Sequence, residues 1–485
     1  MGKKHGPKRK PKSGLNRTPL EGHHFAGGVF TPPLARLPKM SPASWMNDRL
    51  PEMLWACLIH EFLGRDKALD CFRRIFVFIA QHTQKELLAD ITLTGISKLP
   101  EQLRKEFIWH IIEPSDVKQA LAPLRLFDSL PAKDEWRLLL PNLSASVSLL
   151  MSAVGKTLFH QSQEATDCRW LRLMPYLITG QFQMPPEMVK ELQFYPNLGD
   201  QRMVRPMIRS SEINVGNFDG EISNSLWSKS FWAEAWEKTP CLELVSKGNS
   251  AVIPQVITVE LIDDVSNKLR EHWHASHSTT AIDAKHDGVF GMAFYVLRIF
   301  SEIHQTGNEA TILGRLGLRS ILETRINLGY LLKKNESALW EKWRKYGAGQ
   351  AKLSAVKFDF GVNVPKYIDL ESVEQIANED VWDEFLPIKI NHWCDLDLRK
   401  LSVEAGLKEI YDQHYSWTSA YSHGVWGPVR EACLTPCGNP LHRLHRYPKR
   451  KVLPGIVDDA ASLVDAVLEA LNGAYPSFTP RLLKP

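Results

Sequence analysis

Residues 53–82 read MLWACLIHEFLGRDKALDCFRRIFVFIAQH and carry the clearest helical pattern in the chain. Large apolar side chains recur there at spacings of three and four, the period of one face of an α-helix. They are Leu54, Leu58, Phe62, Leu69, Phe72, Ile75 and Phe76. Glycine often separates two helices, and Gly64 interrupts this pattern. The stretch therefore predicts a pair of helices, or one long broken helix.

The same period extends along most of the chain and predicts an all-α fold. Helices are expected at 101–112, 115–127, 144–160, 186–194, 226–237, 258–275, 288–305, 311–333, 337–354, 371–377, 400–422 and 456–472. No alternation with a period of two extends beyond a few residues, so strands are not expected. The pattern indicates an N-terminal helical domain over 44–240, a linker over 241–254, and a C-terminal helical bundle over 255–478.

A basic, proline-rich tail precedes the first expected helix. Seven basic residues and no acidic one precede Glu21, whereas the whole chain has a net charge of only +4. A segment this polar buries too little apolar surface to fold alone, so residues 1–43 are expected to be disordered. The tail either neutralises phosphates of a nucleic acid or is simply solvated.

Composition excludes several classes of protein. No apolar run approaches the roughly 18–20 residues that a membrane-spanning helix needs, and no apolar segment follows the basic N-terminus as in a secretory signal. The seven cysteines are odd in number and scattered. We therefore expect reduced thiols, a cytoplasmic location and no membrane partner. A chain this long needs neither disulfide nor metal to fold, and no cofactor is expected.

Gly155-Lys156-Thr157 is similar to the end of a phosphate-binding loop. That loop needs an earlier glycine where this chain has Leu150, and the segment lies within an expected helix. A phosphate-binding loop is therefore rejected.

Two thiols and two imidazoles near the C-terminus form a set that zinc could bind tetrahedrally. They belong to Cys433, Cys437, His442 and His445. The central spacing is short for a zinc finger, so chance proximity is the favoured interpretation and no metal ligand is assigned. A zinc-dependent hydrolase at 433–445 is a third-ranked hypothesis.

Residues 442–451 form the densest basic run outside the tail. Their cations could hold a phosphate backbone while Tyr447 stacks on a base. The candidate nucleic-acid-binding residues are Arg443, Arg446, Lys449, Arg450 and Lys451. A solvated surface loop is the favoured interpretation of this run.

Two expected helices carry polar residues beside their apolar faces. Arg315, Arg319 and Glu323 recur every four residues along 311–333, so they share one side of that helix. The other helix, 400–422, carries a polar and aromatic face that includes Tyr415 and Ser422. His423 follows at its C-terminus, where the helix dipole favours an imidazolium.

If these two faces meet, they place acid, base and cation in one interior cluster. Such a cluster could perform acid–base chemistry or bind an anion. The favoured interpretation is a hydrogen-bonded network that fixes how the helices pack, because buried polar groups must be paired. The candidate catalytic residues are Arg319, Glu323, Tyr415, Ser422 and His423.

Three short motifs carry a resemblance to a known family. They are Arg319-Ser-Ile-Leu-Glu323, Tyr421-Ser-His423 and Asn439-Pro-Leu-His-Arg-Leu-His445. Together, over about 285–478, they resemble an uncharacterised bacterial domain-of-unknown-function family that is similar in outline to HEPN domains. HEPN domains are helical bundles, and many are metal-independent ribonucleases of antiviral systems. The resemblance implies a HEPN-like C-terminal bundle, an RNA partner and a homodimer.

The HEPN signature, Arg-x4–6-His, is not met at His423, since no arginine stands five to seven residues before it. Arg298 and His304 match the signature within an expected helix and remain a minor candidate pair.

The leading hypothesis is an RNA-directed, ribonucleolytic effector of bacterial defence or stress response. Arg319 would stabilise the phosphorane, His423 would act as base or acid, and Glu323 would orient one of them. The alternative is a non-enzymatic helical module that binds protein or nucleic acid, with the cluster serving only to hold the bundle together.

Overall fold

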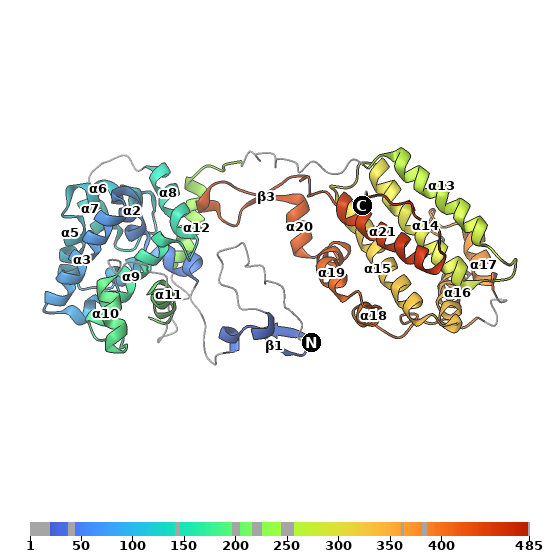
Figure 1. The fold of residues 1–485 in the computed structure, drawn as a ribbon. Coiled ribbons are helices and arrows are strands. Elements are labelled where there is room, and N and C mark those ends of the chain that lie inside the picture. Colours follow the sequence, from blue (N-terminus) through green and yellow to red (C-terminus); the bar gives the residue numbers. More distant parts are fainter. Residues whose placement is uncertain are drawn as a thin grey trace. The chain divides into compact units, whose positions relative to one another are not determined.

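The computed structural model describes residues 20–36, 44–140, 146–195, 204–215, 226–243, 257–359, 363–380 and 386–483. Within these ranges helices dominate and the strands form two short antiparallel ribbons (Figure 1), which confirms the all-α prediction. The chain divides into two compact units. The first unit is 1–243 with 437–445, and the second is 244–436 with 446–485. Of the expected linker, 244–254 lies outside the described residues.

The first unit is built from short helices. They are α1 (Leu50–Glu52), α2 (Leu54–Leu63), α3 (Arg65–Gln81), α4 (Leu93–Ser97), α5 (Glu101–Ile112), α6 (Ser115–Leu121), α7 (Lys133–Leu139), α8 (Val147–Leu158), α9 (Gln163–Ile178), α10 (Pro186–Phe194), α11 (Val204–Asn214) and α12 (Leu226–Lys238). A π-helical turn η3 (Trp45–Arg49) and 3-10 turns η4 (Lys85–Leu88), η5 (Ala122–Leu126) and η8 (Pro440–His442) complete it. The predicted break falls at Gly64, whose φ of 77° no ordinary helix accommodates.

Helices α2 and α9 form the centre of the first unit. All residues of 54–60 in α2 and of 165–176 in α9 are buried, so both helices are covered on every side. Helices α3, α6 and α8 pack on α2, while α3 and α11 pack on α9. Helix α9 nevertheless carries charged side chains, and a charge so deeply buried needs a partner of opposite sign.

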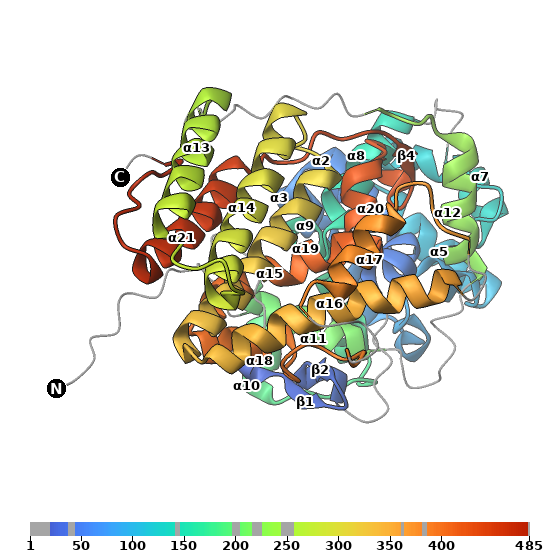
Figure 2. The same ribbon diagram turned by 90° about the vertical axis from the view of Figure 1, so that its right-hand side faces the viewer.

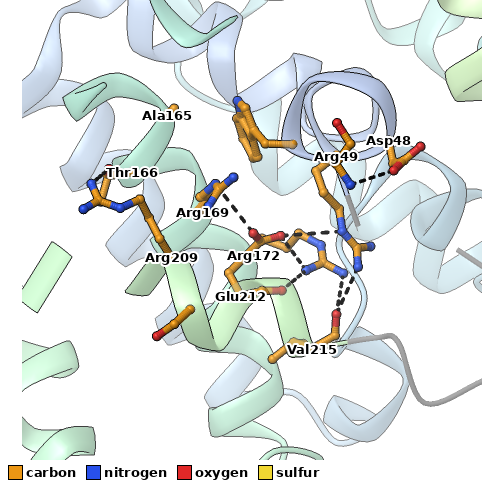
Figure 3. A network of polar contacts seen from close by, with 12 residues as sticks. Asp48, Arg49, Ala165, Thr166, Arg169, Arg172, Arg209, Glu212 and Val215 are labelled. Carbon is orange, nitrogen blue, oxygen red and sulfur yellow. Dashed lines mark hydrogen bonds and ion pairs between the residues drawn. The ribbon is translucent and has the colours of Figure 1, made fainter. Parts of the chain in front are cut away.

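Glu212 of α11 supplies that partner (Figure 3). Its Oε1 lies 2.8 Å from Nη1 of Arg172 and 3.7 Å from Nε of Arg49, and its Oε2 lies 3.6 Å from Nε of Arg169. All four side chains are at most 2% exposed. Arg172 and Arg49 also donate hydrogen bonds to the carbonyl oxygen of Val215. Burial first, and repulsion from Arg172 second, lower the pKa of Arg49 to about 10, against the attraction of Glu212.

The second unit is a bundle of longer helices. They are α13 (Val259–Ser276), α14 (Ala284–Gln305), α15 (Ile312–Lys334), α16 (Ser337–Asp359), α17 (Leu370–Asn378), α18 (Leu398–Ala405), α19 (Lys408–Ser422), α20 (Trp426–Cys433) and α21 (Val457–Ala474). Helices α14, α15 and α21 pack on one another around an apolar core, with α13 against α14. Helix α16 runs across α14 (Figure 2). Strands β3 (Leu434–Pro436) and β4 (Arg446–Pro448) pair antiparallel.

The structure corrects the predicted helix 400–422, which is two helices. Gly406 ends α18 with a φ of 78°, a left-handed conformation that glycine adopts without strain, and α19 begins at Lys408. Six helices of the described residues were not predicted at all: α1, α4, α7, α9, α11 and α20.

Part of the tail expected to be disordered is also structured. Strands β1 (His24–Ala26) and β2 (Val29–Thr31) form a hairpin, flanked by 3-10 turns at Leu20–Gly22 and Pro33–Arg36. Gly27 and Gly28 both have positive φ, as a tight hairpin turn requires. Residues 1–19 and 37–43 lie outside the described residues.

Across the described ranges, no helix combines the length and the apolar character that crossing a bilayer demands.

Replacing Glu212 with glutamine should destabilise the first unit strongly. The substitution keeps the shape of the side chain but leaves three buried guanidinium groups without their shared carboxylate. Breaking a buried ion pair from one side costs about 3–5 kcal/mol of unfolding free energy. Urea denaturation of the full chain would measure this loss, and hydrogen exchange would localise it to α9 and α11. The exposed Glu191 on α10 offers a matched control, and Glu191→Gln should leave the unfolding midpoint nearly unchanged. Equal midpoints for the two variants would contradict a central role for Glu212.

Candidate functional site

The polar stripes of α15 and α19 meet in the second unit. Nε of Arg319 donates to Oε1 of Glu323 at 2.7 Å, and Nη1 donates to Oγ of Ser419 at 3.2 Å and also to Oγ of Ser422. The guanidinium lies over the ring of Tyr415, 5.3 Å from its centre. Four of the five candidate catalytic residues are therefore brought together. Ser419 joins them, and its spacing of three from Ser422 on the same helix could have revealed it.

Arg319 retains hydrogen-bonding capacity in this arrangement. Its Nε and Nη1 groups are used, whereas Nη2 makes no hydrogen bond within the part of the chain that the structure describes. The side chain is 19% exposed, so solvent or a ligand can reach it. A guanidinium with two remaining N–H donors suits a phosphate or carboxylate oxygen.

His423 is placed beside this cluster rather than within it. It caps the C-terminus of α19, directly after Ser422, and its side chain is exposed. The imidazole makes no hydrogen bond or ion pair among the described residues.

A second polar contact adjoins the cluster one turn earlier on α15. The hydroxyl of Tyr421 donates to Oε2 of Glu431 at 2.7 Å, and the guanidinium of Arg315 lies 5.9 Å from the ring centre of Tyr421. Burial first, and the Glu431 carboxylate second, raise the pKa of Tyr421 to about 12. This tyrosine therefore stays protonated near neutral pH and serves as a hydrogen-bond donor.

The candidate nucleic-acid-binding residues are divided between the two units. Arg443 belongs to the first unit, where it lies 4.7 Å from the ring centre of Trp232 and donates to Oδ1 of Asn47. Burial of this half-buried side chain lowers its pKa, and the contacts with Trp232 and Asn47 orient its guanidinium. The other four lie in the second unit. Among them Arg446 stacks on Trp426, at 5.9 Å from the ring centre.

The remaining basic residues border a cavity of about 750 Å³ in the second unit. Lys449, Arg450 and Lys451 form one side, and the first turn of α15 and the end of α20 form another. Backbone hydrogen bonds fix this strip, since the amides of Lys449 and Lys451 donate to the carbonyls of Cys433 and Ala432. The backbone of this strip is thus fixed at the edge of a concave surface that its basic residues border.

The four residues considered for zinc are not gathered as a set. Cys433 ends α20 in the second unit and is exposed, whereas Cys437, His442 and His445 belong to the first unit. Cys241 lies beside these three residues instead of Cys433. The ligand atoms of Cys241, Cys437, His442 and His445 all lie within 4.8 Å of one another. Cys241 was missed because it stands almost two hundred residues away in the sequence. A repeated Thr-Pro-Cys, at 239–241 and 435–437, is the signal that could have found it.

Two minor candidates have ordinary structural roles. Arg298 pairs with Glu302, and His304 pairs with Glu309, so the Arg-x4–6-His match does not form one site. Gly155-Lys156-Thr157 lies inside α8, where the Thr157 hydroxyl donates to the carbonyl of Ala153.

A buried cluster around Asp167 was not anticipated. Its carboxylate accepts hydrogen bonds from Nε of Arg65 at 2.8 Å, from Gln163 at 2.7 Å and from the Tyr195 hydroxyl, and it lies 3.1 Å from Nε2 of His60. Burial opposes its charge, but the hydrogen bonds from His60, Arg65 and Tyr195 outweigh burial and lower its pKa. With every carboxylate oxygen satisfied and no exposed surface on Asp167, this cluster stabilises the fold.

Comparison with known proteins points to the second unit. Residues 296–431 match the model of a family of unknown function, DUF5677. The matched segment contains α15 and α19, and with them the whole Arg319 cluster and His423. Neither curated proteins nor solved structures gave a match.

Replacing Asp167 with asparagine should change how stability depends on pH. The pKa of Asp167 in the folded protein lies below its value near 4 in the unfolded chain. The contribution of this carboxylate to the free energy of unfolding is therefore fully present above pH ~4 and is lost as pH falls through the folded pKa. We expect Asp167→Asn to lower the unfolding free energy by roughly 2 kcal/mol at pH 7, with a smaller difference from wild type at pH 3. Urea denaturation at both pH values measures this. Asp70→Asn, which removes an exposed pair with Arg73, should show little change at either pH.

Proposed function

We propose that this chain is an RNA-directed effector of bacterial defence or stress response whose second unit binds and cleaves RNA at the Arg319 cluster. The observation that carries the proposal is that the Arg319 guanidinium is oriented by the protein and still has N–H donors for a ligand. Glu323 and two serine hydroxyls orient it, yet its Nη2 group keeps two donors for an anion. The exposed His423, whose imidazole makes no hydrogen bond or ion pair among the described residues, stands directly after Ser422 in the chain.

This arrangement suits cleavage by the 2′-hydroxyl of RNA. His423 would accept the proton of that hydroxyl, and the 2′-oxygen would attack the neighbouring phosphorus. The bond from phosphorus to the 5′-oxygen then breaks, and that oxygen takes a proton from water. Arg319 would stabilise the charge that develops on the phosphorane. The products are a 2′,3′-cyclic phosphate and a 5′-hydroxyl, and no metal ion takes part.

The basic strip along the cavity offers a second contact for the same strand. The cavity begins at the first turn of α15, and Arg319 lies seven residues beyond Ile312. At 1.5 Å per residue, Arg319 is roughly 10 Å along the helix from Ile312, which lines the cavity. One strand could therefore place one phosphate at Arg450 and Lys451 and another near Arg319.

A non-enzymatic role in binding protein or nucleic acid is the second candidate, and one observation favours it. Three donors of Arg319 are already satisfied within the protein, and its cation also lies over Tyr415. Such a network can serve solely to hold α15 against α19.

Cleavage of total RNA by the full chain, without added divalent metal, tests the enzymatic proposal. Wild type should produce fragments ending in cyclic phosphate. Arg319→Ala should slow cleavage about 10²–10³-fold and His423→Ala about 10²–10⁴-fold, because one loses phosphorane stabilisation and the other the base. Thermal transitions of both variants must match wild type for this comparison.

Arg298→Ala is the matched control for this assay. Arg298 also pairs with a glutamate four residues later, but it is 79% exposed and lies on α14, which contributes no residue to the cluster. Its cleavage rate should equal that of wild type. If wild type does not cleave RNA and Arg319→Ala melts early, the structural role stands instead.

Binding of RNA should depend on salt through the basic strip. Each phosphate contact on a single strand adds about 0.7 to the slope of log affinity against log salt. Arg450→Ala with Lys451→Ala should therefore weaken binding and reduce that slope by about 1.4. The exposed pair Lys268 and Arg270 on α13 provides a charge-matched double variant that should bind as wild type does. Equal slopes for the two double variants would exclude the strip as the contact.

A further inference from the structure

The segment 437–445 returns to the first unit and is tightly packed there. Leu441 is 2% exposed and belongs to the apolar core of that unit, and Pro440 approaches Gly155 of α8 so closely that a Cβ atom there would lie 3.1 Å from the proline ring. Asn439 is fully buried and donates to the carbonyl of Pro240. Two sulfur and two nitrogen ligands gather at the point where this segment meets the end of α12.

We propose that Cys241, Cys437, His442 and His445 form a structural zinc site. Their distances fit that geometry. In a tetrahedral site with Zn–S of about 2.3 Å and Zn–N of about 2.05 Å, sulfur and nitrogen ligands lie about 3.6 Å apart. Sγ of Cys241 lies 3.4 Å from Nδ1 of His442 and 3.7 Å from Nδ1 of His445, and Sγ of Cys437 lies 3.8 Å from Nδ1 of His442.

The hydrogen bonds of His442 leave the correct nitrogen for the metal. The Thr239 hydroxyl donates its hydrogen to the carbonyl of Ala235 at 2.6 Å, so its oxygen can only accept at the 3.0 Å contact with Nε2 of His442. The proton of this imidazole is therefore on Nε2, and the lone pair of Nδ1 points at the two sulfur atoms. A ring nitrogen held in this way by a neighbouring group is typical of histidines that bind zinc.

The surroundings of Cys437 suit a thiolate. Its Sγ accepts hydrogen bonds from the backbone amides of Leu242 and Asn439, both at 3.4 Å. Backbone pairing of Cys437 with Glu243, and the bond from the amide of Gly438 to the carbonyl of Leu242, hold the two cysteine-bearing segments together. Amide donors aimed at sulfur stabilise its negative charge, which zinc binding requires.

The ring of Trp236 covers the imidazoles. Its centre lies 4.6 Å from that of His442 and 4.6 Å from that of His445. Four protein ligands fill the coordination of zinc, so no position remains for a substrate or an activated water. The site would fix 437–445 onto the first unit, and it is independent of the proposed RNA chemistry.

Zinc content of the purified full chain tests this inference. Wild type should hold about one zinc per chain, whereas Cys241→Ser and His442→Ala should each hold less than about a tenth of that. Cys433→Ser is the matched control and should keep all its zinc, because Cys433 is exposed and outside the set. Loss of zinc in Cys433→Ser with retention in Cys241→Ser would overturn the ligand assignment.

Two measurements on the wild-type chain do not depend on whether variants fold. Exchange of the metal for Co²⁺ should give the absorption of a tetrahedral site together with sulfur-to-cobalt charge transfer. Removal of metal by a chelator should speed alkylation of Cys241 and Cys437 at least about tenfold, with Cys433 unchanged. If no zinc copurifies, added Zn²⁺ and Co²⁺ do not bind, and the thiols react alike with and without chelator, the site is a set of hydrogen-bonded thiols and the inference fails.

Discussion

The first unit depends on pairing the charges buried by its central helix. Helix α9 can lie in the middle of the unit only if Arg169 and Arg172 have a partner of opposite charge, and Glu212 of α11 is the partner that they share. With α9 fixed, α2 packs on it, α8 packs on α2, and η8 packs on α8. The segment 437–445, with its sulfur and nitrogen ligands, therefore rests on a sequence of contacts that begins at one carboxylate. An unpaired charge at any of these positions would cost several kcal/mol, a large part of the stability of a typical domain.

The second unit also contains an arginine held by polar partners, but that arginine is not fully buried. Arg172 is fully buried, and its Nη1 and Nη2 groups are both bound to Glu212 or Val215. Arg319 is bound through Nε and Nη1, but it remains partly exposed with Nη2 available. Both side chains are oriented by their surroundings. Only a partly exposed arginine such as Arg319 can also bind an external anion. This difference in exposure distinguishes the candidate site from the stabilising network around Arg172.

Residues 437–451 show how one short segment can carry two kinds of chemistry. Its first part supplies Cys437, His442 and His445 to the first unit, and its second part lines a cavity of the second unit with cations. In the sequence the two parts appear as one basic, histidine-rich run. The fold divides these residues between the two units, and Arg443 contacts Trp232 in the first unit. Proximity in the sequence was therefore a poor guide to which residues act together.

The sequence alone determined the all-α class, the break at Gly64, the full extent of α5 and α10, and the polar stripes of α15 and α19, because these follow from local periodicity. It did not predict α9 or α11, since Asp167, Arg169, Arg172 and Glu212 interrupt the apolar pattern that marks a buried helix. The sequence also did not predict that Cys241 lies beside Cys437. It placed His423 in the Arg319 cluster, whereas this side chain makes no hydrogen bond to the cluster. Those facts depend on contacts between residues far apart in the chain, and helical periodicity carries no information about them. Tertiary packing decided which buried charges have partners of opposite sign. It also decided which cysteine and histidine side chains lie together, and which arginine keeps N–H donors for a ligand.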